Sequence, residues 1–142
     1  MKTRKLVVVA MLLAGISVGA SAQSCFSSTA VEGPALKAKI VQNYLACLSS
    51  ANEGTVESAM AQIAWMQLRN PSLDLSGFKS QIDHLARKGS TLLIRYKAYL
   101  TGAVLENVRL FSNESHGSYN EADELYLAVS SRLSQTALSA LR

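Results

Sequence analysis

Residues 23–142 lack the motifs by which most enzymes are identified from sequence. They contain no G-x-S-x-G nucleophile elbow, no phosphate-binding P-loop and no Rossmann glycine set. The metal-binding spacings H-E-x-x-H, E-x-x-H and the EF-hand loop are also missing, and the whole chain has only two histidines. These absences argue against the common hydrolases, nucleotide-dependent enzymes and metalloproteins. Catalysis without such a motif stays open.

A long apolar run is also missing, although the chain begins with a short one. Basic residues at positions 2, 4 and 5 precede an uncharged stretch over residues 6–18, and residues 20–22 form an A-x-A site. This order predicts a Sec-type signal peptide over residues 1–22, cleaved after Ala22. The stretch is shorter than the roughly 18–20 residues of a spanning helix. We therefore expect a periplasmic or secreted protein with no membrane span after cleavage.

Neither sign of charge is in large excess once the leader is removed. The full chain has 14 Lys and Arg against 10 Asp and Glu, a net charge of +4. The leader holds three of the cations and none of the acids, which leaves 11 against 10 and a net charge of +1. A nucleic-acid partner needs a strongly cationic face, so none is expected. The 120 remaining residues fit one domain.

Cysteine is limited to Cys25 and Cys47. An even number of cysteines in an exported protein favours a disulfide, and only one intramolecular pairing is available. Without the C-x-x-C spacing of redox-active pairs, a structural role is favoured. A loop of this size contributes on the order of 3 kcal/mol in the chain-entropy estimate. We predict a disulfide-tethered segment over residues 23–35, followed by one α-helical domain over residues 36–142.

Period-two alternation is absent, whereas helical periodicity recurs throughout the domain. Apolar residues at spacings of three and four predict an all-α fold of about five helices, joined by short loops into antiparallel αα-hairpins. The expected helices span residues 36–48, 55–69, 75–88, 91–108 and 119–141. In the fourth of these helices the apolar stripe is expected to include Leu93, Tyr96, Leu100 and Val104.

Residues that begin or end helices accompany this periodicity. The predicted N-caps are Thr55 for the second helix, Asp74 or Ser76 for the third, and Ser90 or Thr91 for the fourth. Residues 118–121 read S-x-x-E, a capping box for the last helix. Gly89 is the expected C′ residue of the third helix, and Gly102 is interpreted as a site of close helix approach.

The first four helices show two similar hairpin units. Residues 50–54 form a polar turn before Val56 and Ala59, and residues 89–91 precede Ile94, Arg95 and Ala98 in the same way. Two core leucines of the first unit lie 37 residues before an isoleucine and a leucine of the second. This pattern resembles HEAT repeats, two-helix units of about 40 residues. Glu57 replaces the typical Arg, and two units are fewer than the usual three. A two-unit HEAT-like array and an irregular helical bundle both stay open.

The stretch IRYKAYL interleaves cations with aromatics. Tyrosine and arginine are common anchors of protein interfaces, so one interpretation is a contact patch. Its candidate partner-binding residues are Arg95, Tyr96, Lys97 and Tyr99, together with Trp65 and Met66 on the second helix. In the alternative interpretation Tyr96 packs inward, and the other three residues of the stretch decorate a solvated helix face.

A weaker candidate is a metal site near the start of the last helix. His116 lies close in sequence to Glu121 and Glu124, but no metal-ligand spacing is present. Acidic residues also favour a helix N-terminus without any metal. No cofactor and no catalytic residue are predicted.

The sequence is thus most consistent with a small exported helical protein that binds another periplasmic or envelope protein. Two alternatives stay open. One is a metal-dependent protein or enzyme with a site near His116 and Glu121. The other is a structural or envelope-stress protein without a defined site.

Overall fold

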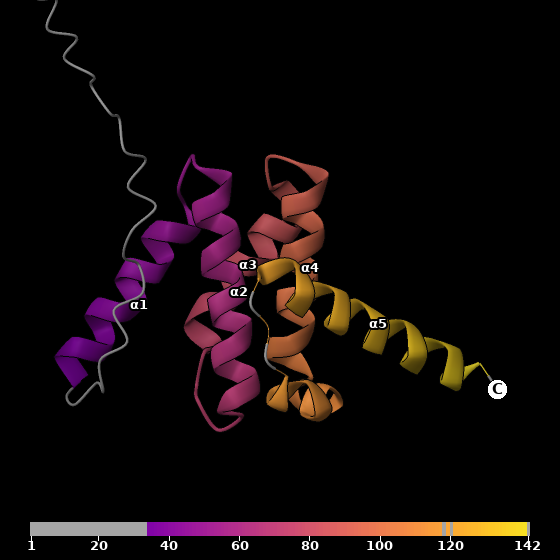
Figure 1. The fold of residues 1–142 in the computed structure, drawn as a ribbon. Coiled ribbons are helices and arrows are strands. Elements are labelled where there is room, and N and C mark those ends of the chain that lie inside the picture. The colour runs from indigo at the N-terminus through magenta and orange to yellow at the C-terminus, as the bar shows by residue number, and fades with distance from the viewer. Residues whose placement is uncertain (1–33, 118, 120, 142) are drawn as a thin grey trace, which may run out of the picture.

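The computed structural model describes residues 34–117, 119 and 121–141, and over these residues every regular element is a helix (Figure 1). The predicted all-α fold is confirmed, and all five expected helices are present. A 3-10 helix, η1, was not predicted. The elements are α1 (Pro34–Leu48), α2 (Glu53–Arg69), α3 (Ser76–Lys88), α4 (Leu92–Glu106), η1 (Val108–His116) and α5 (Ala122–Ala140). The predicted leader, Cys25 and Ser118 lie outside the described residues.

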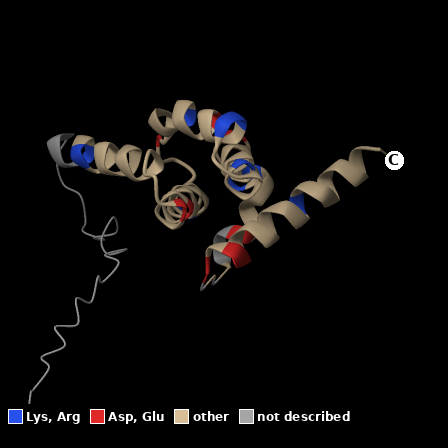
Figure 2. Cartoon of the chain, turned by 90° about the horizontal axis from the view of Figure 1, so that it is seen from above, with Lys and Arg blue, Asp and Glu red and all other residues tan. Residues whose placement is uncertain are grey.

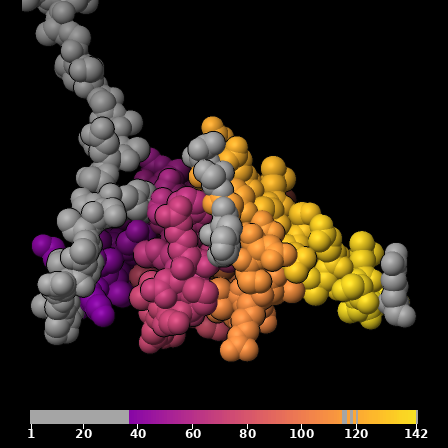
Figure 3. All heavy atoms as spheres, turned by 60° about the horizontal axis from the view of Figure 1, so that its bottom comes forward, coloured from indigo at the N-terminus to yellow at the C-terminus, as the bar shows by residue number. Residues whose placement is uncertain are grey.

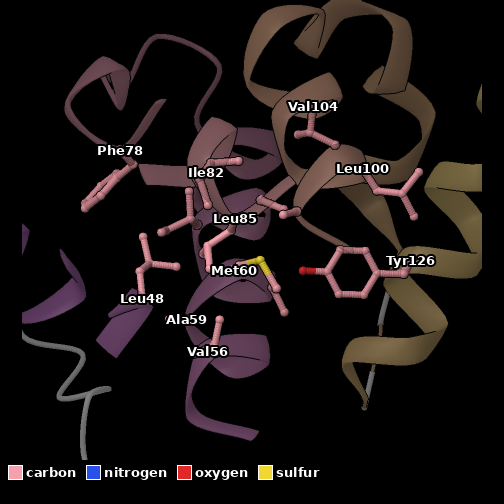
Figure 4. Packing of buried hydrophobic residues seen from close by; sticks show 14 of the residues in the cluster. Leu48, Val56, Ala59, Met60, Phe78, Ile82, Leu85, Leu100, Val104 and Tyr126 are labelled. Carbon is pink, nitrogen blue, oxygen red and sulfur yellow. The ribbon is translucent and has the colours of Figure 1, made fainter. Parts of the chain in front are cut away.

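Two helical hairpins form the body of the protein. Helix α1 packs against α2 and α3, while α4 packs against α2 and α3. Figure 1 shows α2 and α4 side by side, with η1 at their lower end. The core between these elements contains side chains with no more than 1% exposure from each of the helices α1 to α4, including Leu48, Met60, Ile82 and Leu100 (Figure 4). The close-packed core follows from apolar faces at helical spacing.

The predicted buried stripe of α4 is correct only in part. Leu100 and Val104 are buried as expected, but Leu93 is 54% exposed and Tyr96 is 50% exposed. Lys97 and Thr101 are buried instead, because both find polar partners on other helices. The apolar faces of α2 and α3, which include Met60 and Ile82, lie in the core.

Side chains cap two of the helices. The Asn52 side chain accepts a hydrogen bond from the Thr55 backbone N–H at 3.2 Å, so Asn52, not Thr55, is the N-cap of α2. Thr91 is the N-cap of α4 as predicted, and it accepts from the Ile94 N–H at 3.3 Å. A side-chain oxygen at either position satisfies an amide that the helix itself leaves unpaired.

Two other helix starts differ from the predictions. The N-cap of α3 is Leu75, which forms no side-chain cap hydrogen bond, although the Asp74 carboxylate accepts from the Ser76 N–H at 3.0 Å. Helix α5 begins at Ala122, because Glu121 has extended backbone angles, φ −128° and ψ 153°. The predicted capping box, which placed Glu121 inside the helix, is therefore wrong.

The two glycines singled out in the sequence have different roles from those expected. Gly89 ends α3 with φ −55°, outside the left-handed region. A side chain there would nevertheless clash, because its Cβ would lie 2.7 Å from the Leu85 carbonyl oxygen and 2.8 Å from Ile94 Cγ2. At Gly102 the nearest atom to an added Cβ is Ile82 Cγ2 at 3.7 Å, an ordinary contact. Close approach thus requires glycine at position 89 and not at position 102.

Helix α5 packs on the body mainly through its first half. Its buried residues are Leu125, Tyr126 and Val129, and the second half has none. The second half projects away from the body toward the C-terminus (Figures 1 and 3). No helix among the described residues combines the length and apolar character that crossing a membrane requires.

Candidate functional site

An open groove lies between α4 and the projecting half of α5. Its volume is about 510 Å³. One wall consists of Tyr96, Tyr99 and Leu100 of α4, and the other consists of residues from α5. The α5 residues are Ser130, Leu133, Ser134, Thr136, Ala137 and Ala140. None of these nine side chains is charged, so the groove presents an apolar surface with hydroxyl groups along it.

Large exposed side chains follow one face of α4 and include the two tyrosines of the groove wall. Leu92, Tyr96 and Tyr99 follow one another at spacings of four and three, which places them on one face of the helix. They are 77%, 50% and 58% exposed. The opposite face of α4 is buried against the other helices, and about half or more of each side chain in this stripe stays exposed among the described residues. A contiguous apolar patch of this kind commonly marks an interaction site.

An ion-pair cluster around the buried Lys97 side chain attaches the beginning of α5, and hence the second wall, to the body. The Lys97 ammonium lies 2.6 Å from Asp123 Oδ1 on α5 and 3.2 Å from Glu57 Oε1 on α2. It also lies 5.5 Å from the centroid of the Tyr126 ring. One cation thereby connects three helices. We refer to Lys97, Glu57 and Asp123 as the Lys97 cluster.

Two polar contacts complete the attachment of α5. Thr101 donates a hydrogen bond to the Lys97 carbonyl at 2.9 Å, so its hydroxyl oxygen is left to accept one from the Tyr126 hydroxyl at 3.1 Å. Further along α5, the Arg132 Nε–H donates to the Leu110 carbonyl of η1 at 3.1 Å. The helix is therefore held at its start and near its middle. Beyond Arg132 its contacts with the body are few.

The electrostatics of the Lys97 cluster favour a structural role. Burial acts to lower the pKa of Lys97, but hydrogen bonds to Asp123 and Glu57 outweigh it, and the pKa is raised. Burial raises the pKa of Tyr126, and the nearby carboxylates reinforce this. Lys97 therefore stays protonated at neutral pH and is not a nucleophile, and Tyr126 stays neutral. Neither Lys97 nor Tyr126 therefore supplies an acid or a base near pH 7.

The structure separates the residues of the predicted contact patch on α4. Tyr96 and Tyr99 are brought together in the groove, whereas Lys97 points to the opposite side and is only 5% exposed. Arg95 is half-buried, and its Nε–H donates to the Thr91 carbonyl at 3.3 Å. The alternative interpretation, with Tyr96 inward and Lys97 on a solvated face, does not match these positions.

The other two predicted contact residues, Trp65 and Met66, lie on α2 and are half-buried. The Arg69 guanidinium covers the Trp65 ring at 3.9 Å, and the Tyr119 ring meets it edge-on at 6.3 Å between centroids. Trp65 and Tyr119 border a smaller hollow of about 180 Å³, which shares no residue with the groove. The predicted patch thus falls into two separate places.

The metal and disulfide predictions involve residues that are only partly described. Glu121 and Glu124 are exposed at the start of α5, while His116 ends η1 and its side chain lies outside the described part. Among the described residues no three or more potential ligands gather to hold a metal ion. Cys47 is buried in the core, and its predicted partner Cys25 lies outside the described residues. The disulfide stays a prediction.

Sequence reasoning missed the α5 wall of the groove and the Lys97 cluster. The last helix was predicted, but none of its residues was chosen as a contact residue, although only Arg132 is charged between residues 130 and 141. That scarcity of charge was the available signal. The cluster had no local signal, because Lys97 is far from Glu57 and Asp123 in sequence.

Comparisons of the chain with protein-family models, with curated proteins and with solved structures find no match.

Proposed function

We propose that the protein is an exported helical module that binds another periplasmic or envelope protein through the groove between α4 and α5. One observation carries the proposal: Tyr96 and Tyr99, both half exposed, face an uncharged wall of α5 across an open groove. Export rests on the three-part leader pattern of residues 1–22.

The chemistry of the groove favours a helix as its ligand. Amphipathic helices bind in apolar grooves through a few large side chains spaced along one face. Tyrosine suits the receiving surface, because its ring covers a large area at little conformational cost while its hydroxyl reaches water or a partner. The serine and threonine hydroxyls along α5 add polar contacts that orient such a ligand.

The helical body that carries the groove is proposed to be a two-unit HEAT-like array. Support comes from the packing of α1 on α3 and of α2 on α4. In stacked repeats each unit packs its first and second helices on those of its neighbour. The sequence resemblance covers the same four helices, so the α5 attachment is an addition to the array that creates the groove.

Site-specific crosslinking in the intact envelope tests the proposed function. A photo-crosslinking residue is placed at Tyr99, in the groove, or at His84, which is exposed on α3 away from the groove. Mass spectrometry then identifies the adducts. We expect a defined protein adduct from position 99 that position 84 does not give.

The identified protein is then purified and its binding is measured by calorimetry. Removal of an interface tyrosine that anchors a contact costs about 1–2 kcal/mol or more, so Tyr99→Ala should weaken binding about tenfold. Identical adducts from positions 99 and 84, or an affinity unchanged by Tyr99→Ala, would contradict the proposal.

A further inference from the structure

We infer that the groove between α4 and α5 also binds a second copy of this chain, in a symmetric dimer that places the projecting half of each α5 in the groove of the other copy. This inference rests on the proposed function, because it takes the groove to be a protein-binding surface. It adds a specific partner, whose binding can be tested with the purified protein alone.

The chain itself carries the kind of ligand that the groove fits. The last turns of α5 have no side chain buried against the described residues, and their leucines Leu138 and Leu141 are 64% and 84% exposed. The groove borders the same helix, so groove and ligand lie next to each other on one surface. A two-fold axis through this region brings each helix end to the other copy's groove, the self-complementary arrangement of most homodimers.

Charge does not oppose this association. Between residues 130 and 141 the only charged side chain is Arg132, and its Nε–H is directed at the Leu110 carbonyl of the same chain. Figure 2 shows this helix with acidic residues at its start, one basic position and an otherwise uncharged length. The groove residues are uncharged as well. Two copies therefore meet without like charges in contact and without the cost of burying an unpaired ion.

The uncovered area is of the size that a dimer needs. A tyrosine buries about 150–250 Å² when fully covered, so the exposed halves of Tyr96 and Tyr99 offer roughly 200 Å² together. Leu92, Leu138 and Leu141 offer roughly 200 Å² more, at about 100 Å² for a whole leucine. These side chains give about 800 Å² for two copies, and the small side chains of the groove bring the total to on the order of 1,000 Å², the size of a weak interface.

Sedimentation equilibrium of the purified protein tests the inference. The groove variant is Ala137→Asp and the matched control is Ser139→Asp, because both residues are exposed near the end of α5 but only Ala137 lines the groove. The wild type and Ser139→Asp should dimerise with a dissociation constant in the micromolar range, whereas Ala137→Asp should weaken the dimer at least tenfold. Circular dichroism should be alike for all three proteins, since neither position is buried.

Two results would overturn the inference. One is a wild type that stays monomeric at a protein concentration about 100 times the expected dissociation constant, and the other is equal dimerisation of both variants. The envelope crosslinking separates this outcome from failure of the proposed function. If position 99 crosslinks another protein while the purified chain is monomeric, the inference fails and the proposed function stands. If the purified chain dimerises through the groove and position 99 crosslinks only a second copy, the inference stands and the envelope partner is excluded.

Discussion

The Lys97 cluster provides the sharpest test of how the groove is built. Replacement of Lys97 by Met keeps most of the aliphatic side chain but removes the ammonium that connects Glu57 and Asp123. The change leaves the carboxylates of α2 and α5 without their cation. We expect α5 to be held less firmly and the protein to be less stable.

The size of the effect follows from burial. Removal of one partner from a fully buried ion pair costs about 3–5 kcal/mol. In this cluster the Lys97 side chain is 6% exposed, but Glu57 is 26% and Asp123 is 71% exposed, so water reaches both carboxylates. We therefore expect a loss of about 2 kcal/mol in the free energy of unfolding, or a Tm lower by about 5–10 °C.

Urea unfolding followed by circular dichroism measures the loss, and Lys79→Met is the matched control. Lys79 lies 3.0 Å from Asp83 and 2.6 Å from Glu106, distances like those of Lys97, but it is 45% exposed. We expect no measurable loss of stability from Lys79→Met, because exposed ion pairs contribute little.

A second substitution tests the cause of the loss. Glu57→Gln added to Lys97→Met should recover part of the stability, because it removes the carboxylate that lost its partner. Equal effects of the Lys97 and Lys79 substitutions, or purely additive effects of the pair at positions 97 and 57, would refute the reasoning.

Three further predictions concern glycines and pH. Gly102→Ala should stabilise the protein by about 0.5–1 kcal/mol in urea unfolding, because the added Cβ lies 3.7 Å from Ile82 Cγ2 and a helix prefers alanine; a loss of stability would contradict this. Gly89→Ala should destabilise it in the same assay, because the Cβ would lie 2.7 Å from the Leu85 carbonyl oxygen, and an unchanged midpoint would refute the clash. The raised pKa of Tyr126 means that the unfolded chain loses this proton first, so stability is fully present below its ordinary value of 10.0 and falls as pH rises further. Tyr126→Phe should make thermal unfolding less sensitive to pH above 10, and an unchanged pH dependence would contradict the assignment.

The fold was predictable where local patterns and packing agree. The stripe of α2 from Val56 to Ile63 has helical spacing and lies in the core, as does that of α3. Asn52 was missed as the N-cap of α2 because Thr55, three residues later, is also a capping residue by type, although asparagine is the better one. The choice between them depends on where the preceding turn ends.

The site was predictable only in part, because it depends on contacts between distant residues. Tyr96 and Tyr99 could be chosen from residue type, since tyrosines are frequent in interfaces. That Lys97 faces inward depends on Glu57 and Asp123, which come from two other helices. Periodicity treats a lysine as a surface residue, so it cannot place a buried one whose partners lie far away in sequence.

Hydrogen–deuterium exchange of the last turns of α5 tests the binding role of the groove most directly. No side chain of residues 134–141 is buried against the described residues of the isolated chain. The amides of this segment should therefore exchange through local opening that costs little free energy. Addition of the envelope protein captured from position 99, or concentration of the chain itself, should slow exchange in residues 134–141 and leave α1 unchanged. Protection confined to α1, or no protection anywhere, would contradict the assignment of the groove as the protein-binding surface.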